Sequence, residues 1–162
     1  MSASAKVMLL GDIGVGKSSL ARRLVFDRFE ADYKSTIGVD ILTHDLALAG
    51  GPLRLILWDT DGDFGAGIFE SVYLSGASGA VIVADASRPA TLVKMANLAR
   101  GFAARLPGRP CCRVVNKVDL ASAEAPYGDG GDGPPLRASA LTGEGVAPLF
   151  AALGEAILRR AL

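Results

Sequence analysis

Three short runs of apolar residues stand out along the chain, and each predicts a strand that is buried on both faces. The runs are residues 7–10, 80–84 and 111–115. None of them alternates apolar with polar residues, as a strand with one solvent-exposed face would. Between the runs, apolar positions recur every three or four residues, which is typical of amphipathic helices. Strands that alternate with helices indicate an α/β fold with a mostly parallel sheet.

One part of the chain has the pattern of a hairpin, and three others have the pattern of helices. Residues 41–48 and 53–58 flank the sequence Ala-Gly-Gly-Pro, so we expect them to pair as antiparallel strands. The expected helices cover residues 17–26, residues 90–106 and a last segment with an apolar stripe at Val146, Leu149, Phe150, Leu153 and Ile157.

The stretch 124–135 is rich in residues that break regular structure. It contains four glycines and three prolines among its twelve residues, so we expect a loop. A helix of two or more turns across 122–135 is therefore not expected. No repeat and no shift in composition marks a second domain, and we predict one domain over residues 1–162.

Composition and charge narrow the classes of function. Lys and Arg together number 17, as do Asp and Glu, so no net positive charge favours nucleic acid or anionic lipid. The two neighbouring cysteines are not a disulfide framework. No apolar run approaches the ~18 residues of a membrane span, and the N-terminus lacks a signal-peptide pattern, so we expect a cytoplasmic protein. Twelve arginines against five lysines, with abundant Ala and Gly, favour a bacterial source.

The strongest motif is GDIGVGKS, which begins at Gly11 and follows the first predicted strand. It fits the pattern G-x-x-x-x-G-K-[ST] at the point where a strand leads into a helix. Glycines let backbone N–H groups turn toward phosphate oxygens, and the helix N-terminus adds partial positive charge. Lys17 is expected to reach the β- and γ-phosphates, and the Ser18 hydroxyl is expected to bind Mg²⁺.

A carboxylate ends the strand that follows the hairpin turn. Asp59 lies in the sequence WDTDGD, and we expect it to be the outer partner of Mg²⁺. Gly62 could donate its N–H group to the γ-phosphate. This pattern alone is weak, and it gains its meaning from the phosphate-binding motif before it.

A third motif predicts the choice of base. Asn116-Lys-Val-Asp119 follows directly on the strand 111–115. The Asp119 carboxylate can accept hydrogen bonds from N1 and N2 of guanine, whereas adenine offers no such pair, so a buried carboxylate would reject adenine. The Asn116 side chain can bond the base edge and tie loops together, and the stem of Lys117 can lie along the purine. The backbone N–H of Ala140 is placed to meet guanine O6.

Together these motifs resemble those of the Ras-superfamily small GTPases, most closely the Rab branch. The resemblance covers nearly the whole chain and includes YKSTIGVD at 33–40 and SAL at 139–141. It implies a six-stranded, mostly parallel sheet flanked by helices, the P-loop fold of small G proteins, with GTP or GDP and Mg²⁺ at the carboxyl ends of the strands.

The resemblance also implies residue roles and partners. Thr36 would bind Mg²⁺ in the GTP state, Phe29 would pack on guanine, and Tyr33 would close over the phosphates. Switch segments at about 30–40 and 60–75 would bind effector and regulator proteins. The groups implied in catalysis are Lys17, Thr36, Gly62 and Asp63, and those for the metal are Ser18, Thr36 and, through water, Asp59. The implied nucleotide contacts are Gly11, Gly14, Val15, Gly16, Lys17, Ser18, Ser19, Phe29, Tyr33, Thr36, Gly62, Asn116, Lys117, Asp119, Leu120, Ser139, Ala140 and Leu141.

Two substitutions depart from the family pattern. Asp63 stands where the family carries the glutamine that orients the attacking water, and its charge would repel the γ-phosphate. Ile13 stands where the family prefers a small residue, and it should crowd an arginine supplied by an activator. We therefore predict slow intrinsic hydrolysis and little acceleration by such an activator, which is normally worth ~10³–10⁵. Asp61 adds another negative charge, and both aspartates are equally consistent with ordinary exposed loop residues.

Two functions remain open at this point. The leading one is a GTP-binding molecular switch that hydrolyses GTP to GDP. The alternative is a non-hydrolysing module that keeps nucleotide bound and acts through protein partners. A third class, a P-loop ATPase or kinase, is opposed by Asp119. Residue 2 is Ser and no cysteine lies near Leu162, so we expect no lipid anchor, and a monomer is the expected state.

Overall fold

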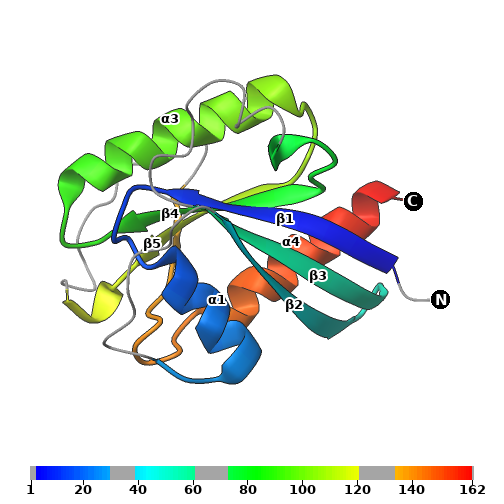
Figure 1. Cartoon of the computed structure of the whole chain (residues 1–162), viewed down its shortest axis with the longest axis horizontal. Coiled ribbons are helices and arrows are strands. Elements are labelled where there is room, and N and C mark those ends of the chain that lie inside the picture. The colour runs from blue at the N-terminus through cyan, green and yellow to red at the C-terminus, as the bar shows by residue number, and fades with distance from the viewer. Residues whose placement is uncertain (1–2, 30–38, 61–72, 121–133, 162) are drawn as a thin grey trace.

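The computed structural model describes residues 3–29, 39–60, 73–120 and 134–161, and its strands form one six-stranded sheet (Figure 1). The strand order is β2-β3-β1-β4-β5-β6, and every neighbouring pair is parallel except β2 and β3. The strands are β1 (Ala3–Gly11), β2 (Val39–Leu48), β3 (Gly51–Thr60), β4 (Gly79–Asp85), β5 (Cys111–Asn116) and β6 (Leu136–Arg137). The helices are α1 (Lys17–Phe26), α3 (Pro89–Arg105), α4 (Val146–Ala161) and the short 3-10 helix η1 (Val118–Leu120).

The predicted fold class is confirmed. The three apolar runs lie in β1, β4 and β5, the hairpin is β2 and β3, and the three predicted helices are α1, α3 and α4. The glycine- and proline-rich loop lies almost entirely outside the described residues, so the expectation that it forms no helix stays a prediction. No helix in the described part of the chain is long and apolar enough to cross a membrane.

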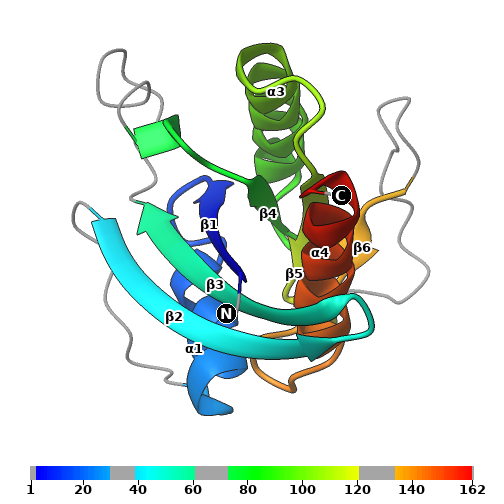
Figure 2. The same ribbon diagram turned by 90° about the vertical axis from the view of Figure 1, so that its right-hand side faces the viewer.

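Helices cover both faces of the sheet. Figure 2 shows α3 on one side of the sheet and α1 and α4 on the other. The two layers explain why the central strands read as continuous apolar runs. In β1, Val7 and Leu9 face α1 and α4, while Met8 and Leu10 face α3, and all four are at most 3% exposed. Alternate side chains of these four residues enter opposite cores, so all four positions are apolar.

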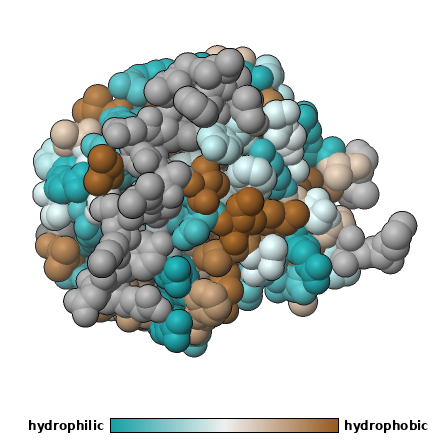
Figure 3. Space-filling view, in the orientation of Figure 1, coloured by the Kyte–Doolittle hydropathy of each residue, from teal (hydrophilic) through white to brown (hydrophobic). Residues whose placement is uncertain are grey.

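One face of the hairpin is not covered by a described helix. Ile41 is 52% exposed and pairs with Trp58, which also contacts Tyr73 at 6.2 Å between ring centroids. The Lys6 ammonium lies 3.9 Å from the centroid of the Trp58 ring and donates to the carbonyl oxygen of Ser75 at 2.9 Å. Figure 3 shows apolar side chains gathered near the middle of the molecular face seen in the orientation of Figure 1. The exposed Ile41 and the partly exposed rings of Trp58 and Tyr73 make this face apolar, as in a contact surface.

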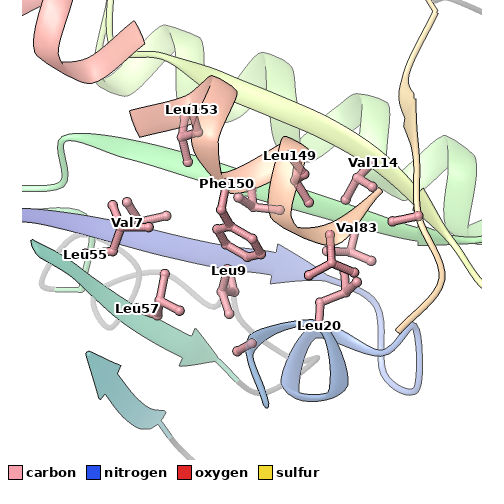
Figure 4. Close-up of a cluster of buried hydrophobic side chains, with 14 of the residues drawn as sticks. Val7, Leu9, Leu20, Leu55, Leu57, Val83, Val114, Leu149, Phe150 and Leu153 are labelled. Carbon is pink, nitrogen blue, oxygen red and sulfur yellow. The ribbon is translucent and has the colours of Figure 1, made fainter. Parts of the chain in front are cut away.

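The larger core lies between the sheet and the helices α1 and α4. Figure 4 shows Phe150 of α4 pointing toward the strands, among Val7, Leu9, Leu57 and other aliphatic side chains. The α4 stripe predicted from its spacing is the face that enters this core. Close packing also reaches the hairpin, where Gly154 of α4 lies against Leu46 and Leu48.

The two glycines inside helices give a matched test of this packing. A Cβ at Gly154 would lie 2.8 Å from Leu48 Cδ1, whereas a Cβ at Gly101 of α3 meets nothing within 4 Å. We expect Gly154→Val to lower the free energy of unfolding by about 1–3 kcal/mol, because the added atoms overpack the contact with the ends of the Leu46 and Leu48 side chains. Gly101→Ala should raise the free energy of unfolding by about 0.5–1 kcal/mol, because alanine has a higher helix propensity than glycine. Urea denaturation measures both, and a Gly154→Val protein as stable as the parent would contradict the packing.

Candidate functional site

The loop between β1 and α1 follows a path that only glycine allows at two positions. Gly11 ends β1 with φ +150°, and a Cβ there would lie 2.5 Å from the carbonyl oxygen of Val83. Gly16 precedes α1 with φ +98°, and its Cβ would collide with the side-chain nitrogen of Asn116. The motif glycines therefore bring the loop into contact with β4 and with the loop after β5.

Side-chain donors hold the carbonyl groups of this loop. The Lys17 ammonium donates to the carbonyls of Gly11 and Asp12, at 3.0 Å each. The Lys117 ammonium donates to the carbonyl of Gly14 at 2.8 Å, and the Asn116 amide donates to that of Val15 at 3.0 Å. These bonds fix the orientation of successive peptide planes.

The orientation of the carbonyls determines that of the N–H groups. The described peptide bonds are all trans, and in a trans peptide the C=O and N–H groups point in opposite directions. Because the carbonyls of Gly14 and Val15 point toward Lys117 and Asn116, the N–H groups of Val15 and Gly16 point the other way. Together with the first turn of α1, they form a concave row of donors that suits an anion such as a phosphate.

A second cluster lies at the start of α1. The Ser18 hydroxyl donates to Oδ2 of Asp59, and both residues are at most 9% exposed. The carboxylate is brought there by the parallel pairing of β1 and β3, in which Asp59 lies opposite Leu9. Both are hard oxygen ligands, the kind Mg²⁺ prefers, so this pair fits the metal expected from the sequence.

No metal site is complete from the described side chains alone. Among the described residues, no group of three or more His, Cys, Asp or Glu is placed to hold a metal ion. A magnesium ion at Ser18 and Asp59 would therefore need ligands from water, from phosphate or from other parts of the chain, which is its usual mode of binding at nucleotide sites.

The loops after β5 and β6 meet beside the phosphate-binding loop. Asn116 accepts a hydrogen bond from the backbone N–H of Ala140 at 3.1 Å while its amide donates to Val15. Asp119 accepts from the Ser139 hydroxyl at 2.6 Å. Arg23 of α1 donates to the carbonyls of Ala140 at 2.8 Å and Leu141 at 2.6 Å. Three separate loops are thus joined through side chains.

Two details concern the groups predicted to contact the base. Asp119 lies on η1 and is an exposed residue, although its carboxylate accepts from Ser139 in a partly buried contact. The Ala140 N–H, expected to meet guanine O6, donates to Asn116 in this structure. Leu120 and Leu141 are 64% and 50% exposed, and Phe29 is 38% exposed beyond the end of α1. These three apolar side chains lie at the surface.

Several predicted residues lie outside the described residues. These are Tyr33, Thr36, Gly62 and Asp63, with most of the two expected switch segments and the neighbouring Asp61. The structure describes the last residues of the first expected switch segment, which form the start of β2. It describes the last residues of the second segment at 73–75. Ser19 lies in α1 directly after Ser18, where its N–H belongs to the first helical turn.

Sequence reasoning missed Asp85, the buried charge at the centre of the site. Asp85 ends β4 opposite Asn116, is 1% exposed, and accepts from Lys117 at 2.9 Å. Its other oxygen accepts from the Ser87 N–H at 2.8 Å and the Ser87 hydroxyl at 2.6 Å. Burial alone would raise the pKa of Asp85, but the hydrogen bonds from Ser87 and Lys117 outweigh it and the pKa is lowered. Its position at the end of a buried strand, as for Asp59, was the available signal.

The contacts of Arg23 and Arg88 could not be anticipated from a motif. Arg23 lies on α1 beyond the glycine-rich segment, and Arg88 precedes α3. Arg88 donates to the carbonyl of Ile13, and Lys94 lies 3.4 Å from Asp12. Neither a spacing rule nor a residue type distinguishes these cations from other surface arginines and lysines.

Comparisons with known proteins agree with this arrangement. A model of the Ras family matches residues 6–159. The Ras-related protein Rab-18-B of Danio rerio is 30% identical over 162 residues, which cover 95% of this chain and 79% of that protein. The Ras-related proteins RABA1b of Arabidopsis thaliana and RIC2 of Oryza sativa subsp. japonica are 43% and 42% identical over 86 residues, which are 53% of this chain and 40% of each relative. These relatives are eukaryotic, so they give no support to a bacterial source.

The buried Asp85 carboxylate, bonded to the partly exposed Lys117, predicts a pH dependence of stability. A carboxyl group with a lowered pKa in the folded state stabilises it fully above the unfolded pKa of about 3.9, and this contribution is lost as the pH falls through the lower folded value. We expect Asp85→Asn to reduce the free energy of unfolding by about 1–3 kcal/mol at neutral pH and by less below pH ~4.

The matched control is Asp45→Asn, which removes an exposed carboxylate paired with Arg54 at 2.7 Å. Solvent screens exposed pairs of this kind, so this variant should leave the free energy of unfolding almost unchanged. Chemical denaturation between pH 2.5 and 7 measures both variants. An Asp85→Asn effect that is independent of pH would contradict the assignment.

Proposed function

Because this chain belongs to the Ras family, we propose that it is a guanine-nucleotide switch that binds GTP and GDP with Mg²⁺ and hydrolyses GTP slowly. The observation that carries the proposal is the position of Asn116. Its amide bonds the carbonyl of Val15 and its oxygen accepts from Ala140, so one side chain joins the phosphate-binding loop to the base-binding loops. A ligand that occupies both regions must carry phosphates and a base.

The charges and donors near the loop suit a polyphosphate. Lys17 is 6% exposed, and its ammonium is held within the loop by two carbonyls. In this position it can turn toward phosphate oxygens without a large change in the backbone. The N–H groups of Val15 and Gly16 add donors that are already oriented. Preoriented groups of this kind stabilise charge that develops during phosphoryl transfer.

The metal would be held by Ser18 and Asp59. When bound, Mg²⁺ neutralises charge on the β- and γ-phosphates. The protein side chains contribute position: Ser18 opens α1, and Asp59 is fixed by the strand pairing behind it. In the proposed site, Thr36 is the further ligand expected in the GTP state.

Slow hydrolysis follows from the residues near the attacking water. Asp63 would meet the negative γ-phosphate, and the Coulomb repulsion would oppose the position that a neutral glutamine can take. Ile13 is 49% exposed on the phosphate-binding loop, where its branched side chain would hinder an arginine supplied by a partner. Both effects raise the activation barrier to GTP hydrolysis without weakening the contacts to the base.

The exposed face of the hairpin is the partner surface that we propose. Ile41 and Trp58 lie on it side by side, and Ile41 is next to the first switch segment along the chain. A partner bound there would contact the hairpin and the switch together, so it could distinguish the two nucleotide states. We propose effectors and regulators as its occupants, a monomeric state and a cytoplasmic location.

A non-hydrolysing module is the second candidate. The exposed Ile13 and the aspartate at position 63 favour it, because both concern hydrolysis rather than binding. In that case the nucleotide would remain bound, and only its exchange would change the protein. Phosphate production by the purified protein separates the two functions.

The first test of the proposal is the choice of nucleotide. Protein freed of nucleotide should bind GDP and GTP in the presence of Mg²⁺ and bind ATP at least about 100-fold more weakly, because adenine cannot pair with the carboxylate. Asp119→Ala should weaken GDP binding by at least about tenfold. The matched control is Glu144→Ala. Glu144 is exposed on the neighbouring loop, and its backbone carbonyl, which the substitution keeps, accepts from the Ser139 N–H at 2.9 Å. It should change the affinity by less than about twofold.

Isothermal titration calorimetry gives these affinities. Equal binding of ATP and GTP would refute the role of Asp119, and no binding of either would refute the proposed function.

The second test concerns the rate of hydrolysis. Asp63→Gln should speed single-turnover phosphate release by at least about tenfold, because the neutral amide can orient water without repelling the γ-phosphate. Asp61→Asn serves as the control, because it removes a charge close in sequence but places no amide at position 63. A wild-type rate equal to that of Asp63→Gln would contradict slow hydrolysis, and an equal gain in Asp61→Asn would assign the effect to charge alone.

A further inference from the structure

Arg88 holds a carbonyl of the phosphate-binding loop from outside all of the nucleotide motifs. Its two terminal nitrogens both donate to the carbonyl oxygen of Ile13, at 3.0 and 2.8 Å. Arg88 is the residue before α3, and 75 positions separate it from Ile13 in the sequence. The contact therefore links the helix on one side of the sheet to the loop between β1 and α1.

The bonded carbonyl belongs to the same peptide unit as the N–H of Gly14. In a trans peptide these two groups point in opposite directions, so a carbonyl held toward Arg88 turns the Gly14 N–H toward the concave side of the loop. The next two peptide units are held in the same way by Lys117 and Asn116. Arg88 thus extends the row of oriented donors by one position, at the outer end of the loop.

The guanidinium is itself held in place by its surroundings. It lies 3.9 Å from the carboxylate of Asp12 on one side and 3.9 Å from the buried Asp85 on the other. Lys94, in the second turn of α3, also lies 3.4 Å from Asp12. A Cβ on Gly14 would come within 3.1 Å of the guanidinium, which shows how closely the group packs on the loop.

An exposed ion pair alone would contribute little here. The Arg88 side chain is 43% exposed, and that of Asp12 is 34% exposed, so solvent screens their attraction. The forked bond to one carbonyl is different, because it depends on the planar guanidinium and a lysine cannot reproduce both of its arms. The specific effect of Arg88 is therefore expected on the orientation of the peptide unit.

We propose that Arg88 is a positioning residue that sets how long a nucleotide stays bound, by holding the 13–14 peptide unit with its N–H group toward the phosphates. The inference rests on the proposed function of this site. Arg88 acts through the loop, so its loss should affect retention of GDP and of GTP alike. Without the arginine, the unit can rotate, and the bound phosphates lose one oriented donor for part of the time.

The test measures the release of a fluorescent GDP analogue from the full chain after addition of excess GDP. Arg88→Ala should release the analogue about five- to tenfold faster, as expected from the loss of a charge-assisted hydrogen bond. Arg88→Lys should fall between Arg88→Ala and the wild type. Arg100→Ala is the matched control on the same helix, since Arg100 is exposed and its side chain donates to Asn97. Release from Arg100→Ala should match that of the wild type.

A second measurement separates positioning from direct action on the transferred phosphate. In Arg88→Ala, the fold-change in release should exceed the fold-change in single-turnover hydrolysis of GTP bound beforehand. Unchanged release combined with slower hydrolysis would overturn the inference, because Arg88 would then act on the reaction. Release from Arg88→Lys equal to that of the wild type would also overturn it, because charge alone would suffice.

GDP binding by the wild type distinguishes a failure of this inference from a failure of the proposed function. A wild type that takes up no GDP contradicts the proposed function and the inference together. A wild type that binds GDP, with an Arg88→Ala variant that binds and releases it at the same rate, contradicts the inference alone. Thermal unfolding of the nucleotide-free variants should agree within a few degrees, so that faster release is not the result of a damaged fold.

Discussion

The proposed activity depends on the orientation of a few peptide units between β1 and α1. A phosphate-binding loop must turn its N–H groups inward, and the chain does this by giving its carbonyls partners on the outside. Lys17, Asn116 and Lys117 each donate to one or two of them. Two of these donors belong to the base-binding motif, so the two halves of the site are parts of one hydrogen-bonded unit. A change in either loop must alter the other.

The sheet makes this arrangement possible. β1, β3, β4 and β5 run parallel, so their carboxyl ends lie along one edge. Asp85 and Asn116 end two of these strands, Asp59 is the next-to-last residue of a third, and each is 1% exposed. A buried polar group at such a place is costly unless it is bonded, and strand pairing with its fixed register makes the bonding reliable. The continuous apolar runs behind these residues supply the rigid support.

Much of the fold and part of the site could be predicted from residue patterns. The strands β1, β4 and β5 could be predicted because both of their faces are buried. The helix α4 could be predicted because its apolar stripe has helical spacing. The glycine-rich loop and the Asn116 motif were readable because their chemistry needs fixed residue types at fixed spacing. Asp85 follows the same strand-end rule as Asp59, but it lacked a neighbouring motif to draw attention to it.

The remaining contacts depend on tertiary geometry. Arg23 and Arg88 act through long side chains that reach carbonyls more than 70 positions away in sequence, and any exposed arginine has the same local pattern. The exposure of Asp119 depends on how η1 is placed at the surface, which no local rule specifies. Motifs thus identify groups that must be of one kind, whereas the supports around them are found only when the chain is folded.

Amide hydrogen exchange, measured residue by residue with and without GDP and Mg²⁺, tests most directly whether the N–H groups of the phosphate-binding loop face the phosphates. We expect GDP to slow exchange of the N–H groups of Gly14, Val15 and Gly16 and of the first turn of α1, since these groups would donate to the phosphates. If exchange at these positions is the same with saturating GDP as without it, the loop does not hold the phosphates, even if the nucleotide binds elsewhere on the protein.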